Sequence, residues 1–221
     1  MAWDRFRSRR TIAARLRRRA APGDEPIFIP DIESLRGKEP CRTRLANVLH
    51  MRLTSLKLES VQDLFLEELR DLYDAENQLL KALPKMAEAA TTPALKLAFS
   101  QHLEQTKGHV GRLDRVFRQL DAKPSGETCE AMKGLVKEGE DFVQAKGEPS
   151  VRDAGLIGAA QRVEHYEMAG YGTARTLAKR LGYQEIATIL QQTLEEEGEA
   201  DKKLTAVAEN EVNVRATAAA P

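Results

Sequence analysis

Residues 61–86 read VQDLFLEELRDLYDAENQLLKALPKM, and apolar residues return in this stretch at intervals of three and four positions. Such spacing lines one face of a helix, so it predicts a long amphipathic helix over about 60–90. Pro84 lies inside the pattern, and we expect a kink or a break there. The predicted apolar stripe comprises Val61, Phe65, Leu69, Leu72, Leu79, Leu83 and Met86.

The same pattern recurs along the rest of the chain. It predicts long helices over about 93–120, 151–181 and 184–210, and a shorter helix over 129–144 in the connection between the second and third. Thr92 and Pro93 are typical of a helix start, and Gly182 is typical of a helix end. Short connections within each pair of long helices predict an all-α fold, a four-helix bundle made of two antiparallel helical hairpins.

The second predicted hairpin resembles a copy of the first, displaced by 91 residues along the chain. The coinciding positions are Glu76 with Glu167, Leu103 with Leu194, Thr106 with Glu197 and Leu113 with Leu204. A stretch of small residues on the third long helix, with Gly170 and Gly172, would let a neighbouring helix approach closely.

Composition excludes several other classes of protein. The 221 residues are 31% charged and only 5% aromatic, a balance typical of long helices with solvent-facing sides. No apolar run approaches the roughly 18 residues of a membrane-spanning helix, so we expect no membrane contact. Two cysteines, Cys41 and Cys129, are too few for a disulfide framework or a Cys-rich zinc site, so we expect a cytoplasmic protein.

The first 52 residues differ from the remainder in charge. They hold 13 of the 34 basic residues and 6 of the 34 acidic ones. We expect a basic segment over 1–52 that is disordered or non-native, the bundle over 53–213 and a frayed tail over 214–221. Three interpretations of the basic segment stay open: an arm that contacts nucleic acid or an acidic partner, an Arg-rich targeting peptide, or sequence upstream of a start at Met51.

Acidic residues interrupt the apolar stripes of three predicted helices. Burying a carboxylate without a partner costs several kcal/mol. Acidic side chains from three helices that point inward at one level of the bundle would therefore need a cation to offset their mutual repulsion. Carboxylate oxygen together with imidazole nitrogen suits iron or manganese, and less exclusively zinc. The predicted metal ligands are Glu76, His102, His109, Glu164, Glu167 and Glu197, with Glu164 as an accessory or bridging ligand and Glu68 as a weaker candidate.

The spacing of these residues matches part of a di-iron carboxylate pattern. Thirty residues after Glu76 comes Thr106, and His109 follows three positions later. Thirty residues after Glu167 comes Glu197, but Ala200 takes the place of the histidine. The ligand set is therefore incomplete, and a di-iron, mononuclear iron or manganese site stays open beside a buried polar network hydrogen-bonded to Tyr73, Tyr166 or Tyr171. By the same angular count His165 and Glu195 point outward.

Four segments together resemble the bacterial YciE/YciF stress-protein family of the ferritin-like superfamily. They read FLEELRDLYDAE at 65–76, HLEQT at 102–106, EHYE at 164–167 followed by Tyr171-Gly172, and LEEE at 194–197. The resemblance covers about 58–209. It implies a ferritin-like bundle, a homodimer, a metal centre and expression linked to stress, but no demonstrated reaction.

Three functions follow from these observations. The first is a stress-response protein that binds iron or manganese inside the bundle, with oxygen or peroxide chemistry at an open coordination position. The second is a non-catalytic scaffold or interaction protein without a functional metal site. The third is nucleic-acid association through the Arg-rich segment, which would depend strongly on salt. The sequence assigns no catalytic residue and leaves open whether the protein is an enzyme.

Overall fold

The computed structural model describes residues 56–124, 126 and 128–219, so the basic segment predicted for 1–52 lies outside the described residues. Within them every regular element is a helix. The elements are α1 (Val61–Ala89), α2 (Pro93–Gln119), α3 (Glu130–Gln144), α4 (Pro149–Arg180), α5 (Gln184–Val207), the π-helical segment η2 (Ala208–Val212) and α6 (Asn213–Ala218).

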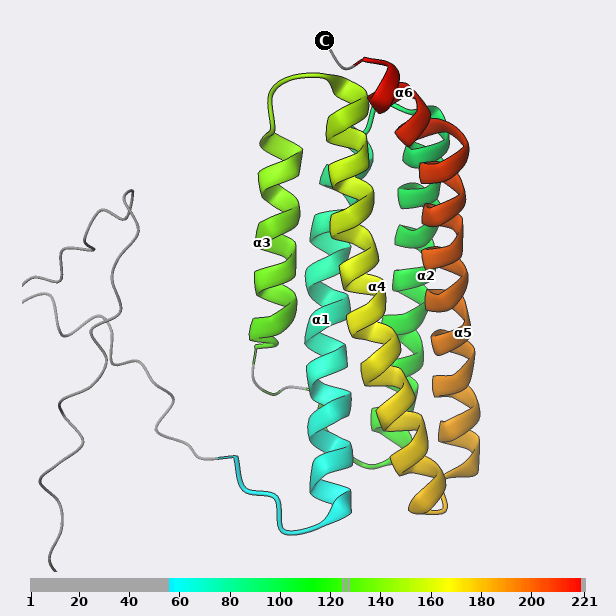
Figure 1. The fold of residues 1–221 in the computed structure, drawn as a ribbon. Coiled ribbons are helices and arrows are strands. Elements are labelled where there is room, and N and C mark those ends of the chain that lie inside the picture. The colour runs from blue at the N-terminus through cyan, green and yellow to red at the C-terminus, as the bar shows by residue number, and fades with distance from the viewer. Residues whose placement is uncertain (1–55, 125, 127, 220–221) are drawn as a thin grey trace, which may run out of the picture. The chain divides into compact units, whose positions relative to one another are not determined.

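Four of these helices form the bundle. In Figure 1, α1, α2, α4 and α5 run side by side, with α1 and α2 as one antiparallel hairpin and α4 and α5 as the other. The shorter α3 lies outside the four, against α1 and α4. It leads the chain back along the bundle, so that α4 begins at the end where α2 begins (Figure 1). The predicted ferritin-like bundle of two hairpins, with an extra helix in the long connection, is confirmed.

The turns that close the two hairpins are built differently. Thr92 is the N-cap of α2 and Pro93 its first residue, as predicted, but the Thr92 side chain makes no capping bond. Instead the buried Asp153 carboxylate of α4 accepts hydrogen bonds from the backbone N–H groups of Thr91 and Thr92 and from the Thr91 hydroxyl. In the second hairpin Gly182 follows the end of α4 at φ 84°, a conformation that glycine adopts without steric cost.

Some details differ from the sequence-based expectations. The helix α1 continues through Pro84, so the predicted break is absent there. Val61 is 50% exposed because it begins the helix, beyond the reach of the packed core. A Cβ atom on Gly170 would lie 2.8 Å from Leu72, which confirms the close approach expected there, whereas Gly172 faces open space. Residues 213–218 are helical, and the fraying of 214–221 and the domain boundary at 53 stay predictions.

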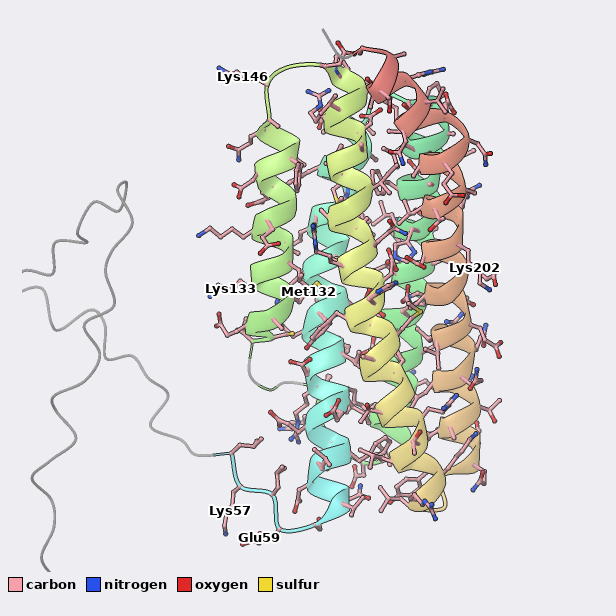
Figure 2. All side chains as sticks on the ribbon, in the orientation of Figure 1. Lys57, Glu59, Met132, Lys133, Lys146 and Lys202 are labelled. Atoms are coloured by element: carbon pink, nitrogen blue, oxygen red, sulfur yellow. The ribbon has the colours of Figure 1, made fainter. Side chains whose placement is uncertain are left out.

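The core consists of two apolar clusters with a polar layer between them. One contains Leu79 and Leu83 of α1 and extends to Met132 of α3, and the other contains Phe65 and Phe117. Figure 2 shows Met132 on the side of α3 that faces α1, while Lys133 and Lys202 project from the outside of the bundle. None of the described helices is long and apolar enough to cross a membrane.

Candidate metal centre

All six predicted ligands lie in the polar layer, between the two apolar clusters. Each long helix contributes at least one of them, because a polar residue occupies the apolar stripe at the same depth on all four. His102 is 5% exposed, Glu164 is 2% exposed and the other four are fully buried. The structure therefore brings together the residues that the sequence singled out: Glu76, His102, His109, Glu164, Glu167 and Glu197.

The six residues form two groups that share Glu197. In the first group, Nδ1 of His109 lies 2.9 Å from Oε1 of Glu197 and 3.2 Å from Oε1 of Glu76. In the second, Nε2 of His102 lies 3.4 Å from Oε1 of Glu164 and 3.6 Å from Oε2 of Glu197. Glu167 completes the second group. Within each group one donor atom of every residue lies within 4.8 Å of the others, a separation at which one cation could contact them all.

Each histidine has one ring nitrogen toward a hydrogen-bond acceptor outside the two groups and the other toward the carboxylates. A carboxylate or amide oxygen can only accept, so Nε2 of His109 donates to Glu196 and Nδ1 of His102 donates to the side chain of Gln105, over 2.9 and 3.4 Å. The remaining nitrogens, Nδ1 of His109 and Nε2 of His102, face the acidic groups. This arrangement is typical of metal-binding histidines, whose outer nitrogen is held by a hydrogen-bond acceptor.

Glu196 contacts the candidate site, but the sequence did not single it out. The outward direction predicted for Glu195 holds, since Glu195 is exposed, but its neighbour Glu196 reaches back to His109. Arg112 fixes it with two hydrogen bonds of 2.6 and 2.9 Å. The signal that could have revealed it is Arg112, a basic residue on α2 beside the apolar stripe and three positions after His109.

The layer has more hydrogen-bonding atoms than partners. Among the described residues, eight buried side-chain atoms of the six candidate ligands make no hydrogen bond, apart from the ion pair over 2.9 Å between Nδ1 of a protonated His109 and Oε1 of Glu197. They are Oε2 of Glu76, Nε2 of His102, Nδ1 of His109, Oε2 of Glu164 and both carboxylate oxygens of Glu167 and of Glu197. Because an unsatisfied buried polar atom costs about 1–3 kcal/mol, such a concentration calls for a further positive group. The donor set fits a divalent cation.

The pKa values of the buried acids and of His109 are shifted because the layer has too few hydrogen-bond donors for its carboxylates. Burial, reinforced by neighbouring carboxylates, raises the pKa of Glu164 and of Glu167 well above the ordinary value. Burial also raises the pKa of Glu76, despite the opposing effect of His109. Burial favours the neutral form of His109, but contacts with Glu197 and Glu76 outweigh it and raise its pKa to about 10. Without a cation, the layer therefore retains protons at neutral pH.

The pKa values of Glu197 and His102 are shifted by the same contacts. Burial works against ionisation of Glu197, but His109 and His102 outweigh it and lower its pKa. Burial lowers the pKa of His102 and keeps its imidazole neutral. A cation at Glu197 would take the place of the proton on His109, so that binding releases protons.

The tyrosines named as hydrogen-bond partners take different roles. Tyr171 is fully buried and donates its hydroxyl proton to Oε1 of Glu76. Tyr166 donates to Asp71 and contacts the thiol of Cys129, away from the two groups. Tyr73 packs edge-on against Phe117. A partial polar network is therefore present, but it reaches only one oxygen of one acidic ligand.

Other candidates lie outside the two groups. Glu68 is half-buried and belongs to neither, and His165 is exposed, as expected. Thr106, at the position aligned with Glu197, donates its hydroxyl proton to the backbone oxygen of His102. The site therefore has two nitrogen donors and four carboxylates, with no donor at Ala200. Oxygen-rich sites with imidazole are typical of iron and manganese.

Comparisons with known proteins agree with this picture. A family model described as "Domain of unknown function (DUF892)" matches residues 60–217. Protein YciF of Escherichia coli (strain K12) is 44% identical over 162 residues, which are 73% of this chain and 98% of that protein. The crystal structure of the E. coli stress protein YciF matches with a TM-score of 0.68 and 45% identity, over 71% of this chain and 99% of that one.

Two further solved structures share the fold. YcfI from Rhodopseudomonas palustris matches with a TM-score of 0.67 and 44% identity, over 70% of this chain and 99% of that one. A protein from Xanthomonas campestris pv. campestris matches with a TM-score of 0.58 over 72% of this chain and 97% of that one. Its identity is 21%, so this likeness concerns the fold alone.

Proposed function

Since the chain belongs to the DUF892 family, we propose that it is a ferritin-like stress-response protein that binds iron or manganese in the polar layer of its bundle. The family resemblance to the YciE/YciF proteins is confirmed by the match to E. coli YciF, which is described as a stress protein. The proposal extends that description to this chain and adds the metal.

One observation carries the metal proposal: eight buried, unpartnered donor atoms lie on six residues in two adjoining groups. Glu76 and His109 would hold an ion on one side of Glu197, and His102, Glu164 and Glu167 would hold one on the other. Either a single ion or a pair is consistent with this division. When bound, iron would supply reactivity toward oxygen or peroxide, a property of the ion itself.

The protein's own residues would prepare the site for the ion. Glu196 and Arg112 orient the His109 ring, and Tyr171 holds one oxygen of Glu76 in place. The apolar clusters on both sides exclude water, which strengthens the attraction between cation and carboxylates. The layer would therefore bind an ion tightly while keeping solvent away from it.

Metal analysis of the purified protein tests this proposal. Protein from cells grown with added iron, or with added manganese, should contain about one or two of these ions per chain. The double variant Glu76→Ala with Glu167→Ala should lose them, while the exposed control Glu195→Ala should keep them. Circular dichroism would verify that each variant is helical, and an oxygen-uptake trace on the iron-loaded protein would show whether it reacts.

The alternative is a scaffold or interaction protein without a functional ion. The hydrogen bonds of Tyr171 to Glu76 and of His109 to Glu196 favour it, because they satisfy part of the layer without a metal. A scaffold predicts no stoichiometric iron or manganese in the wild-type protein. The double variant would then change stability but not assembly.

Assembly and location belong to the same proposal. We expect a cytoplasmic homodimer, and sedimentation of the full chain would give its mass in solution. The nucleic-acid alternative for residues 1–52 predicts binding that weakens as salt rises and that disappears when the segment is removed.

A further inference from the structure

A hollow in the wall of the bundle between α2 and α5 leads toward the candidate ligands. Its inner part is narrow, with a volume of about 20 Å³, and its lining includes Phe99, His102, Gln105, Glu164, Ala200 and Lys203. A larger outer hollow of about 450 Å³ shares three of these residues, Gln105, Ala200 and Lys203. The two spaces thus meet at the same side chains, the outer one facing solvent and the inner one facing two candidate ligands.

The exposure of the ligands identifies this as their solvent side. His102 and Glu164, which line the inner hollow, are the only two of the six ligands with any exposed surface. Nε2 of His102 and Oε2 of Glu164 are both buried without a hydrogen-bond partner. A cation that arrived through the hollow would therefore meet unpartnered donors first.

Residue 200, which lines both hollows, is an alanine. The offset of 91 residues between the hairpins aligns Ala200 with His109, so the second hairpin has a methyl group where the first has an imidazole. The loss of a ligand from α5 thus coincides with a gap in the bundle wall. Ala200 therefore removes a possible ligand and also leaves space for a passage.

A positive charge lies at the mouth of this passage. Lys203 lines both hollows, and its ammonium group donates a hydrogen bond across the gap to Gln101 of α2. The acidic residues on the rim, Glu104 and Glu199, pair with lysines of their own helices over 2.6 and 2.7 Å. Lys203 is therefore a charge that an approaching cation would encounter directly.

We propose that divalent cations reach the polar layer between α2 and α5, past Ala200, and that Lys203 slows their passage until its side chain moves aside. This inference rests on the proposed function, since it concerns the route to that same site. Lysine suits such a role because its ammonium ends a flexible chain of four carbons. The passage adds an access-controlling pair of residues, neither of which is a ligand.

The rate of Co²⁺ uptake tests the route. The full chain, stripped with a chelator, would be mixed with Co²⁺ in a stopped-flow instrument, and the absorbance of the bound ion would be followed. We expect Ala200→Leu to slow uptake by about tenfold or more, because a filled gap must open before an ion passes, with the final amount bound unchanged. Equilibrium titration of each variant separates this rate from affinity.

A matched control comes from the opposite side of the bundle. A second hollow of about 420 Å³ lies at the α1–α4 side, and its lining includes Glu67, Asp71, Tyr166 and Ala169 but none of the six candidate ligands. Ala169→Leu makes the same substitution beside a hollow of similar volume, at an exposed rather than a buried alanine, and uptake should keep its wild-type rate. Slower uptake in Ala169→Leu together with an unchanged rate in Ala200→Leu would overturn the route.

Lys203→Ala provides an independent test, because it should speed Co²⁺ uptake where Ala200→Leu slows it. Removing one positive charge from the mouth should raise the uptake rate about two- to fivefold at low salt, and the gain should shrink as salt rises. An unchanged rate would overturn the role of Lys203. If Ala200→Leu lowers the amount of Co²⁺ bound, the Lys203→Ala rate alone decides the route.

These outcomes separate the route from the proposed function. Wild-type protein that binds no Co²⁺, Fe²⁺ or Mn²⁺ at equilibrium would end the proposed function and the route together. Wild-type protein that binds Co²⁺, with Ala200→Leu and Lys203→Ala both at the wild-type rate, would end the route and leave the proposed function standing.

Discussion

The two hairpins of the bundle occupy equivalent positions but bring different groups to its centre. The first hairpin contributes both histidines and one carboxylate, whereas the second contributes three carboxylates. The first can therefore balance its acid with imidazole, whereas the second contributes no histidine to either group. Repetition of a helical frame thus leaves the chemistry of each half free to diverge.

Two aligned residues show this divergence most directly. Glu76 accepts a hydrogen bond from Tyr171 and lies 3.2 Å from His109, so one of its oxygens is well partnered. Glu167, at the aligned position in the second hairpin, has no hydrogen bond to either oxygen. Glu76 therefore has a partner for one of its two oxygens without a cation, and Glu167 has none.

Replacing each of these two glutamates with methionine should have opposite effects on stability without metal. Glu167→Met removes an unpartnered acid, so the free energy of unfolding should rise by about 1–4 kcal/mol. Glu76→Met leaves Tyr171 and His109 without their acceptor, so the free energy of unfolding should fall by about 1–3 kcal/mol. Urea unfolding of both variants in the presence of a chelator measures these changes.

The same two variants should behave alike once a metal is added. Both lose a ligand, so Mn²⁺ should raise the melting temperature of the wild type more than that of either variant. Equal signs for the two variants without metal would contradict the contrast between the hairpins. A wild-type shift retained in Glu167→Met would remove this residue from the ligand set.

The link between the hairpins gives the next largest effect. Glu196 of the second hairpin holds His109 of the first, and Arg112 fixes Glu196. Glu196→Gln should weaken metal affinity about 10- to 100-fold, because the ring loses the charge that orients it. Competition with a coloured chelator measures this affinity, and Glu195→Gln, an exposed neighbour on the same helix, is the control.

An unchanged affinity in Glu196→Gln would show that the His109 ring is positioned by packing alone. Reduced affinity with unchanged thermal stability of the metal-free protein would identify Glu196 as a positioning residue, since a merely structural role would alter both.

The pH dependence of the metal-free protein should reflect the second hairpin. The pKa values of Glu164 and Glu167 are raised by burial, so the folded protein holds protons that the unfolded chain has released above about pH 4.5. The pKa of His109 is raised to about 10, so it adds stability below pH 6.5 that is lost as the pH rises toward 10. The free energy of unfolding should therefore fall from pH 6 to 9, by up to about 1.4 kcal/mol per unit for each group.

Urea unfolding at several pH values in a chelator checks this slope, and Glu167→Met should flatten it. Added Mn²⁺ should stabilise more at pH 8 than at pH 5, because the ligands must release protons to bind. Stability that instead stays constant from pH 6 to 9 without metal would mean that the carboxylates are already ionised and that His109 is neutral.

Much of this site follows from sequence because helical periodicity reports direction. Glu76, Glu167 and Glu197 interrupt apolar stripes, and a residue within a stripe must point into the bundle. Matching depth followed from the offset of 91 residues, since aligned positions of a repeated hairpin lie at the same level. The burial of His102 and His109 could be predicted for the same reason.

Other contacts could not be predicted, because they depend on the reach of long side chains and on neighbouring helices. Glu196 lies off the stripe, but its side chain spans the gap to His109. Asp153 caps the turn at Thr91 and Thr92 from another hairpin, a contact that sequence spacing does not encode. The π-helical turn over Ala208–Val212 follows α5 without a glycine or proline to mark it.

The ends of α2 and α4 offer the smallest and most closely matched test of the comparison. Both helices close with an equivalent hydrogen bond, from Ala122 N–H to the Phe117 oxygen in one and from Tyr183 N–H to the Ala178 oxygen in the other, each around a residue with positive φ. That residue is Gly182 at 84° after α4 but Asp121 at 48° after α2, so the first hairpin tolerates a conformation that costs an L-residue energy. Asp121→Gly should therefore raise the free energy of unfolding by about 0.5–1 kcal/mol, and Gly182→Ala should lower it by about 1 kcal/mol, both read from urea unfolding in a chelator.

Because both sites lie at the ends of helices rather than in the polar layer, neither change should alter metal content. A loss of stability in Asp121→Gly would mean that the Asp121 side chain contributes more than its backbone conformation costs, and that the two helix ends are alike in shape but not in energy.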